Sequence, residues 1–376
     1  MKIIRFLAAV FTVLFAVPSV FAEAKKEINE NYEYQNAHLQ ALEEFYSDYT
    51  PADEKSFCAF DLKEAIDSGV KFNEVSFIAT HNSYERQGCD AYKKVYNKLS
   101  GLTFGIVSES RPEFESENLT DQFEAGIRSI ELDVETKDEN GDVSFVVSHK
   151  PGVEIRSTCY DFQKALTEIK MWSDHNPGHL PITIIIEPKK DVPFYSGLKN
   201  FTVGYAQKLD EVIRETLGDT LLTPADMMGD YASFKEMREN DGWLTLEDTL
   251  GKVMVLLHDT TITEKYIALD KSIKTQAMFP MLRADDADRD CASFLLINKA
   301  NDALKNSQKI IYDKKLIVRT RTDNFYTKEK DCDKDTAIES GANIISTDHP
   351  VFNNPEREYD YAVTFDGGYT VKLNTK

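Results

Sequence analysis

The chain has 376 residues, and its 64 acidic residues outnumber its 44 basic residues, which gives a formal net charge of −20. A chain this acidic is not expected to bind nucleic acid, and it offers no polybasic patch for anionic lipids. Any lipid substrate would have to be reached through apolar loops, bridging cations or weak collisions.

The first 22 residues have the pattern of a secretory signal peptide. A positively charged start precedes an apolar run over residues 6–17, and small residues lead to a cleavage site after Ala22 or Ala24. The run is too short to span a bilayer, and no later segment reaches its length. We therefore expect a secreted or periplasmic protein without a stable membrane anchor.

The mature chain is predicted to contain an N-terminal arm followed by one large domain. Residues 23–69 are charged and tyrosine-rich, with a helical tendency over residues 37–46, and no Pro/Gly/Ser linker interrupts residues 70–376. Eight short β-branched segments follow in that domain: Val75–Ala79, Ser129–Val134, Val143–Ser148, Ile182–Ile186, Lys252–Leu257, Ser293–Ile297, Lys315–Val318 and Asn343–Ser346.

Helical patterns lie between several of these segments, as over residues 160–173 and 201–217. Strands that alternate with helices indicate βαβ units, and eight of them predict an α/β fold of the (β/α)₈ TIM-barrel type. The connection between the second and third segments is too short for a helix, and its Asn140-Gly141 pair indicates a hairpin. We therefore expect a distorted barrel.

Polar side chains stand at the ends of the first four predicted strands. They are His81 and Asn82, then Glu131 and Asp133, then His149, and then Glu187. Four oxygen donors, three of them carboxylates, suit Ca²⁺ well and Mg²⁺ less well. Two histidines beside a hard cation suit phosphoryl transfer, because one can stabilise charge on phosphorus and the other can protonate a leaving oxygen. The alternative is that the acids are structural partners of Arg or Lys and the histidines are satisfied core groups.

Five cysteines allow two disulfides and one free thiol in an oxidising compartment. The simplest arrangement pairs Cys58 with Cys89 and Cys291 with Cys332, and leaves Cys159 free, although the sequence does not fix the pairing. Their spacing matches no zinc-binding pattern, so we expect no zinc site.

Several of these segments together resemble a known family. The segments Thr80–Tyr84 and Asp121–Asp133 are similar to the calcium-dependent, phosphatidylinositol-specific phospholipase C family, and most closely to its secreted bacterial and fungal branch. Further similar segments are Ser148-His149, residues 172–181, Ile186–Lys189, Thr223–Asp226, Arg319–Asp323 and Gly341–Asp348. The resemblance covers about residues 70–350 and implies a distorted TIM-type barrel.

The resemblance also implies roles for individual residues. His81 and His149 would be the catalytic pair, and the Ca²⁺ ligands would be Asn82, Glu131, Asp133 and Glu187. The substrate would be phosphatidylinositol or a glycosylated form of it, cleaved at a membrane surface to diacylglycerol and inositol 1,2-cyclic phosphate or inositol 1-phosphate. We expect the enzyme to act as a monomer.

A second group of residues is predicted to contact the substrate. Arg319 and Arg321 share a face of the seventh predicted strand and could bind phosphate, or could pair with a carboxylate such as Asp323. Lys150 and Lys189 follow strand ends and could reach phosphate, or could be solvated. Tyr84 could stack on the inositol ring or simply pack.

Three other functions remain open at this point. The first is another barrel phosphodiesterase, of the glycerophosphodiester or sphingomyelinase D-like type, although those families tend to pair the first histidine with Arg where this chain has Asn82. The second is a non-catalytic binding barrel, which predicts the loss of at least one member of the array. The third is a metal-free phospholipase C, against which the three acids argue.

Overall fold

The computed structural model describes residues 25–86, 116–149, 155–190, 197–258, 261–323, 333–350 and 362–374. The predicted signal peptide, Lys150, Cys89 and Cys332 lie outside these ranges. Within them, no helix has the length and apolar character that crossing a bilayer requires.

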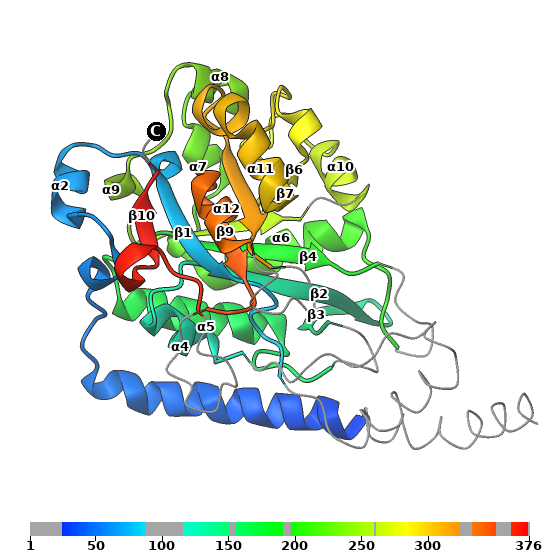
Figure 1. Ribbon diagram of the computed structural model, residues 1–376. Coiled ribbons are helices and arrows are strands. Elements are labelled where there is room, and N and C mark those ends of the chain that lie inside the picture. Colours follow the sequence, from blue (N-terminus) through cyan, green and yellow to red (C-terminus); the bar gives the residue numbers. More distant parts are fainter. Residues whose placement is uncertain are drawn as a thin grey trace, which may run out of the picture.

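Eight parallel strands form the centre of the molecule (Figure 1). They are β1 (Val75–Thr80), β2 (Ser129–Glu139), β4 (Ile182–Pro188), β5 (Val253–Leu257), β6 (Met278–Leu282), β7 (Phe294–Lys299), β8 (Ile317–Arg321) and β9 (Ile344–Thr347). The sheet order is β10-β1-β9-β8-β7-β6-β5-β4-β2-β3, and the antiparallel strands β3 (Asp142–Val147) and β10 (Val371–Leu373) lie at its two ends. The predicted α/β fold with a distorted TIM-type barrel is therefore confirmed.

The barrel closes between β1 and β2 through Ser83, which follows β1 directly. The Ser83 amide donates to the Glu131 carbonyl at 3.0 Å, and the Glu131 amide donates to the Ser83 hydroxyl at 2.9 Å. In a regular strand pair both of these hydrogen bonds would join backbone groups. Here the Ser83 side chain accepts one of them in place of a backbone carbonyl. This closure brings the residues after β1 next to the acids of β2.

The third predicted segment, Val143–Ser148, forms a strand, but the prediction that it belongs to the parallel barrel is wrong. β3 runs antiparallel to β2, with Val147 opposite Val134, so it is the return arm of a hairpin and not a member of the parallel ring. The hairpin turn has positive φ at Asn140 (60°) and Gly141 (94°), as the sequence predicts.

The sequence analysis missed the short antiparallel strand β10 and, among the parallel strands of the barrel, β6. β6 contains Pro280, which has no N–H and normally indicates the end of a strand. In the structure, β6 pairs with β5 up to Pro280 and with β7 from Met281 onward. The proline therefore stands where the strand exchanges one neighbour for the other.

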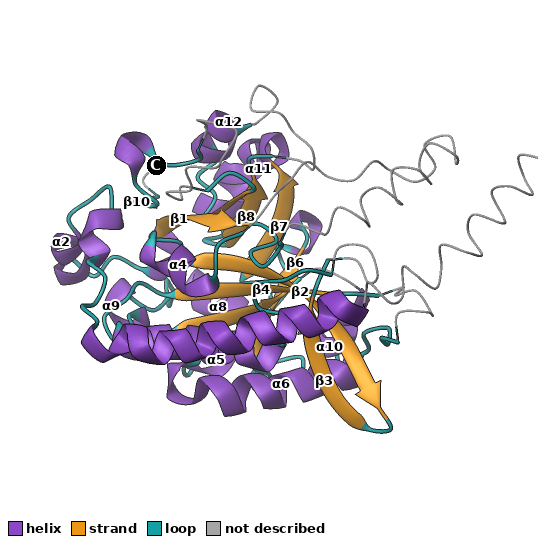
Figure 2. Ribbon diagram, turned by 90° about the horizontal axis from the view of Figure 1, so that it is seen from below, coloured by secondary structure: helices purple, strands orange, loops and turns teal. Residues whose placement is uncertain are grey.

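Helices surround the barrel (Figure 2). The longest that follow the first strand are α5 (Phe162–His175) and α6 (Val203–Leu217), close to the predicted ranges, and the caps Asp161 and Thr202 accept hydrogen bonds from the first-turn amides of Lys164 and Tyr205. The shorter ones are α2 (Leu62–Asp67), α4 (Leu119–Glu124), α7 (Pro224–Met228), α8 (Phe234–Glu239), α9 (Leu246–Thr249), α10 (Thr261–Ile267), α11 (Ala300–Ser307) and α12 (Lys334–Glu339).

The predicted N-terminal helix spans residues 25–45 and lies alongside α5 (Figure 2). Two of its buried amides fix it there. Asn31 donates to the Ile155 carbonyl at 2.6 Å, and Gln35 both donates to and accepts from the backbone of Asp161. The helix thereby holds the segment that leads into α5.

The inward-facing side chains change character along the strands. Toward the amino ends they form an apolar cluster that includes Phe77, Ile185, Leu256, Phe294 and Ile317. The polar residues predicted to carry chemistry come after this apolar cluster on the same strands.

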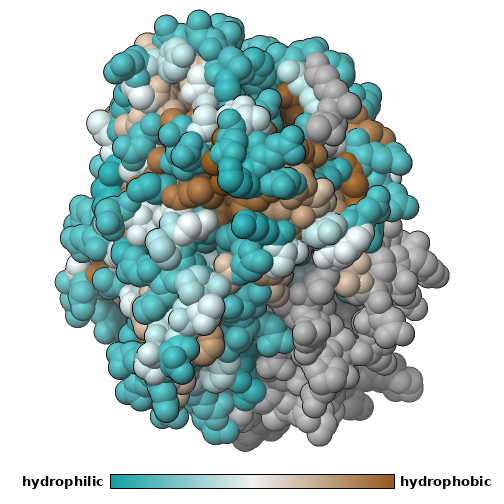
Figure 3. Space-filling view, turned by 90° about the vertical axis from the view of Figure 1, so that its left-hand side faces the viewer, coloured by the Kyte–Doolittle hydropathy of each residue, from teal (hydrophilic) through white to brown (hydrophobic). Residues whose placement is uncertain are grey.

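The surface is mainly hydrophilic on the face shown in Figure 3, interrupted by apolar patches in its upper half.

Each of the two expected disulfides pairs a described cysteine with one outside the described residues, Cys89 or Cys332, and no disulfide joins two described cysteines. Cys58, Cys159 and Cys291 all have free, buried thiols. The Cys58 thiol donates to the Glu54 carbonyl at 3.3 Å, at the start of the 3-10 turn over residues 54–57. The thiol therefore has a hydrogen-bond partner without forming a disulfide.

Candidate active site

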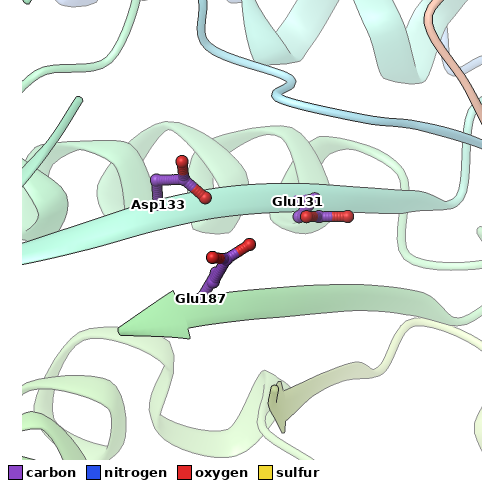
Figure 4. A group of neighbouring side chains, drawn as sticks. All are labelled: Glu131, Asp133 and Glu187. Carbon is purple, nitrogen blue, oxygen red and sulfur yellow. The ribbon is translucent and has the colours of Figure 1, made fainter. Parts of the chain in front are cut away.

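Three acidic side chains converge at the carboxyl end of β2 and β4. Glu131 and Asp133 are two residues apart on β2 and share its inward face, and Asp133 lies opposite Glu187 in the register of the two parallel strands. Carboxylate oxygens of the three residues lie within 4.8 Å of one another. Figure 4 shows Glu187 extending from β4 toward the other two. The sequence prediction that these acids meet is confirmed.

Basic side chains lie against this carboxylate group. Arg319, from β8, donates to Glu131 at 2.5 Å across the barrel, and the ammonium of Lys189 lies 2.7 Å from Asp133 and 3.0 Å from Glu187. Two of the residues predicted to contact substrate are therefore ion-paired with acids in this structure.

The three acids differ in protonation behaviour. Burial alone would raise the pKa of Glu131, but Arg319, and less strongly His81, hold it at about 2. Burial raises the pKa of Asp133 well above its usual range, with Lys189 opposing and Glu187 adding to the effect. Burial alone would raise the pKa of Glu187, but Lys189 and, less strongly, His258 together lower it. Crowded carboxylates of this kind favour the binding of a cation between them.

His81 lies beside this group. Its Nε2 is 3.8 Å from Glu131, and its Nδ1 is 2.6 Å from the carboxylate of Asp348, which follows β9. The side chain is 4% exposed, so the ring is held in place by its surroundings. An imidazole fixed between two carboxylates can exchange a proton with a bound group without reorienting.

Asp348 is a site residue to which the sequence analysis gave no role. Its own amide donates to the Asp323 carboxylate at 3.1 Å and 3.2 Å, and Thr347 donates to the same carboxylate at 2.7 Å. The sequence signals are an acid directly after a buried strand and its place at the end of the family-similar segment Gly341–Asp348. Its partner, His81, becomes visible only when β9 is known to pair with β1.

Asn82 has a left-handed backbone conformation, with φ of 47°, which an asparagine tolerates better than most residues. Its amide nitrogen donates to Glu85 at 3.1 Å, so the orientation of the amide is fixed. The side chain is buried immediately after His81, and its role as a fourth oxygen ligand stays a prediction.

His149 reaches the carboxyl end of the barrel by the hairpin rather than by a barrel strand. β2 runs past the level of Asp133 and β3 returns, so that the Ser148 amide donates to the Asp133 carbonyl at 3.2 Å. His149 is half-buried at this level. The Ser148 hydroxyl donates to the buried Glu135 at 3.0 Å, which anchors the end of the hairpin.

The remaining predicted substrate contacts have different surroundings. The Arg321 guanidinium lies 3.6 Å from Asp348 and 3.7 Å from Asp323, which matches the ion-pair alternative. Tyr84 is completely buried and packs in the apolar core, and burial together with the nearby Asp133 raises the pKa of its hydroxyl well above the usual range, so its contact with substrate stays a prediction. Lys150 lies outside the described residues.

The carboxylate group fits a calcium ion. Its donors are hard oxygens, and Asp133 Oδ1 is buried without a hydrogen-bond partner among the described residues. A buried carboxylate oxygen without a partner is costly, and a bound cation would satisfy it.

The sequence of this chain matches a family described as "Phosphoinositide phospholipase C, Ca2+-dependent" over residues 140–375. The match covers more than half of the chain. The chain belongs to this family. Its members are calcium-dependent phosphodiesterases, so the chain is a calcium-dependent phospholipase C. The three acids described above form a group that could hold a metal ion.

Solved structures show the same fold. The calcium-dependent phosphoinositol-specific phospholipase C from Pseudomonas sp, in its myoinositol complex, has 18% identity and a TM-score of 0.56, covering 87% of this chain and 100% of that one. A calcium-dependent phosphatidylinositol-specific phospholipase C from Streptomyces antibioticus has 20% identity and a TM-score of 0.51, covering 74% and 95%. A search of curated proteins finds no match.

Proposed function

We propose that this phospholipase C, acting as a monomer at a membrane surface, cleaves phosphatidylinositol or a glycosylated form of it. The products would be diacylglycerol and inositol 1,2-cyclic phosphate, with later hydrolysis to inositol 1-phosphate. The observation that carries the proposal is the convergence of three carboxylates beside a histidine that is itself held by Asp348.

We assign metal binding to Glu131, Asp133 and Glu187, with Asn82 as a fourth oxygen donor. A calcium ion bound there would lower the pKa of the inositol 2-hydroxyl and neutralise a phosphate oxygen. The same residues would hold the hydroxyl and the phosphorus in line, which removes much of the entropic barrier to attack.

Proton transfers are assigned to the two histidines and their neighbours. His81, or else the carboxylate of Glu131 or Glu187, would take the proton of the attacking hydroxyl. When a carboxylate does so, His81 donates a hydrogen bond to the phosphoryl group as charge builds on it. His149, half-buried at the end of the hairpin, would protonate the diacylglycerol oxygen as it leaves.

The test is phosphorus NMR of phosphatidylinositol incubated with the enzyme, with and without Ca²⁺. We expect the cyclic phosphate resonance to grow only when Ca²⁺ is present. Phosphatidic acid as the product would indicate another barrel phosphodiesterase. Full activity in EDTA would indicate metal-free chemistry, and no product from any phospholipid would indicate a binding barrel.

A further inference from the structure

Lys189 contacts the same carboxylates that a bound metal ion would need as ligands. Its ammonium is 2.7 Å from Asp133 and 3.0 Å from Glu187, so it bridges two of the three acids assigned to calcium. Its backbone is fixed, because its amide donates to the Val134 carbonyl at 2.9 Å and its carbonyl accepts from the Phe201 amide at 3.1 Å. Only the side chain is therefore free to leave the acids.

Arg319, the other cation of the group, is held much more firmly. It is 2% exposed, and its guanidinium donates to Asn298, to Glu131 and to Ser346. The Lys189 side chain is 18% exposed, and among the described residues its ammonium contacts the two carboxylates alone. A four-carbon stem that ends in a point charge changes position more easily than a guanidinium fixed by three partners.

Charge balance indicates which cation yields. A carboxylate that binds a metal ion is deprotonated, so in the calcium-bound group the three carboxylates and Arg319 leave two negative charges, which a divalent ion balances. If Lys189 also remained, the buried group would carry an excess positive charge in a poorly solvated place, and two cations would share the same oxygens.

We propose that Lys189 is a built-in substitute for calcium, which occupies the acids in the metal-free protein and is displaced when calcium binds. This inference rests on the proposed calcium site. Once displaced, the ammonium stays tethered beside the metal, where it is available to an anionic phosphate group. Metal loading then prepares a phosphate-binding cation, so that calcium precedes substrate.

The experiment is isothermal titration of Ca²⁺ into the metal-free full-length protein and two matched variants, Lys189→Met and Lys190→Met. Lys190 is the adjacent lysine, and its ammonium donates to the Thr261 hydroxyl at 3.1 Å. We expect Lys189→Met to bind calcium about tenfold more tightly than the wild type, since a competing cation is removed. Lys190→Met should bind as the wild type does. Lys189→Gln serves the same purpose if the methionine variant does not fold.

A second measurement uses the unaltered protein. Amine acetylation followed by peptide mass spectrometry should modify Lys189 several-fold faster in Ca²⁺ than in EDTA, because an ion-paired ammonium reacts poorly, whereas Lys190 should not change. Equal or weaker calcium affinity in both Lys189 variants, or equal labelling of Lys189 in the two conditions, would overturn the inference.

The outcome separates this inference from the proposed function. If calcium affinity rises in Lys189→Met but the wild type releases no inositol phosphate, the lysine competes with calcium and the proposed function is wrong. If the wild type cleaves phosphatidylinositol with Ca²⁺ but the Lys189 variants bind calcium no more tightly, the proposed function is supported. The inference that Lys189 substitutes for calcium is then wrong.

Discussion

The two ends of the barrel interior are built by the same strands from opposite kinds of residue. Along β4, buried Ile185 precedes Glu187, and along β8, buried Ile317 precedes Arg319 and Arg321. Toward the amino ends, Phe294 and its neighbours Trp243 and Phe279 pack ring against ring. Alternate side chains of each strand point into the barrel along its whole length. Those near the amino end of the strand are apolar, and those near the carboxyl end are charged.

This difference indicates that the two ends of the barrel interior have different roles. Apolar burial stabilises the fold in proportion to the area removed from water, whereas buried charges are costly unless they are paired. The amino end should therefore carry stability, and the carboxyl end should carry chemistry at some cost in stability.

Removing His149 should have the largest effect. His149→Ala should lower kcat on phosphatidylinositol by about 1,000-fold, since general acid catalysis typically contributes between about 100- and 10,000-fold. Calcium affinity, measured by calorimetry, should not change. His175→Ala is the control, because His175 is exposed and stacks on Tyr46 near the N-terminal helix.

The assignment of His149 as the acid can be tested further with the leaving group. An inositol phosphate ester of 4-nitrophenol does not need protonation, so His149→Ala should cleave it at nearly the wild-type rate. An equal loss on both substrates would show that His149 does not protonate the leaving oxygen.

The amino end is tested by Phe294→Ala. This change should lower the free energy of unfolding by about 3 to 5 kcal/mol, as measured by urea denaturation, because it leaves a cavity among aromatic rings. Calcium affinity of the folded fraction should be unchanged, and Phe294→Leu should cost less. A weakened calcium site in a stable Phe294→Ala protein would contradict the division between the two ends.

The contact between His81 and Asp348 predicts a smaller catalytic effect. Asp348→Asn keeps the size of the side chain and removes its charge, so it should lower kcat by about 10- to 100-fold with little change in KM. Asp348→Glu should restore part of the rate. A rise in KM at constant kcat would instead assign Asp348 to substrate binding.

The dry amino end also predicts a pH dependence of stability. His179 precedes β4 and burial lowers its pKa to about 3. Its unfolded pKa is near 6.5, so the stability it contributes is complete above that value and is lost as the pH falls toward 3. We expect the free energy of unfolding to fall by up to about 1.4 kcal/mol per pH unit within this window. His179→Gln should flatten that slope, and an unchanged slope would show that His179 is not its source.

Much of the site could be predicted because alternation and strand ends are local properties of the sequence. Glu131 and Asp133 share a face by spacing alone, and Pro188 marks the end of the strand that carries Glu187. Cross-barrel contacts are not local, so the pairing of Arg319 with Glu131 and of Asp348 with His81 could not be found in this way.

The errors in the strand assignment have physical causes. β6 was missed because Pro280 interrupts its pattern, yet the proline lies where the hydrogen-bonding partner changes. β3 was placed in the ring because a hairpin arm has the same composition as a barrel strand. The hairpin still delivers His149 to the correct end, because β2 extends past the barrel before it turns.

The central claim is that Glu131, Asp133 and Glu187 form one calcium site. Its most direct test is calorimetric titration of Ca²⁺ into the wild type and Asp133→Asn, which keeps the size of the side chain and removes one charged ligand. We expect one ion per wild-type chain and an affinity about 100-fold weaker in Asp133→Asn. Calcium binding of equal strength and stoichiometry in the two proteins would contradict the account.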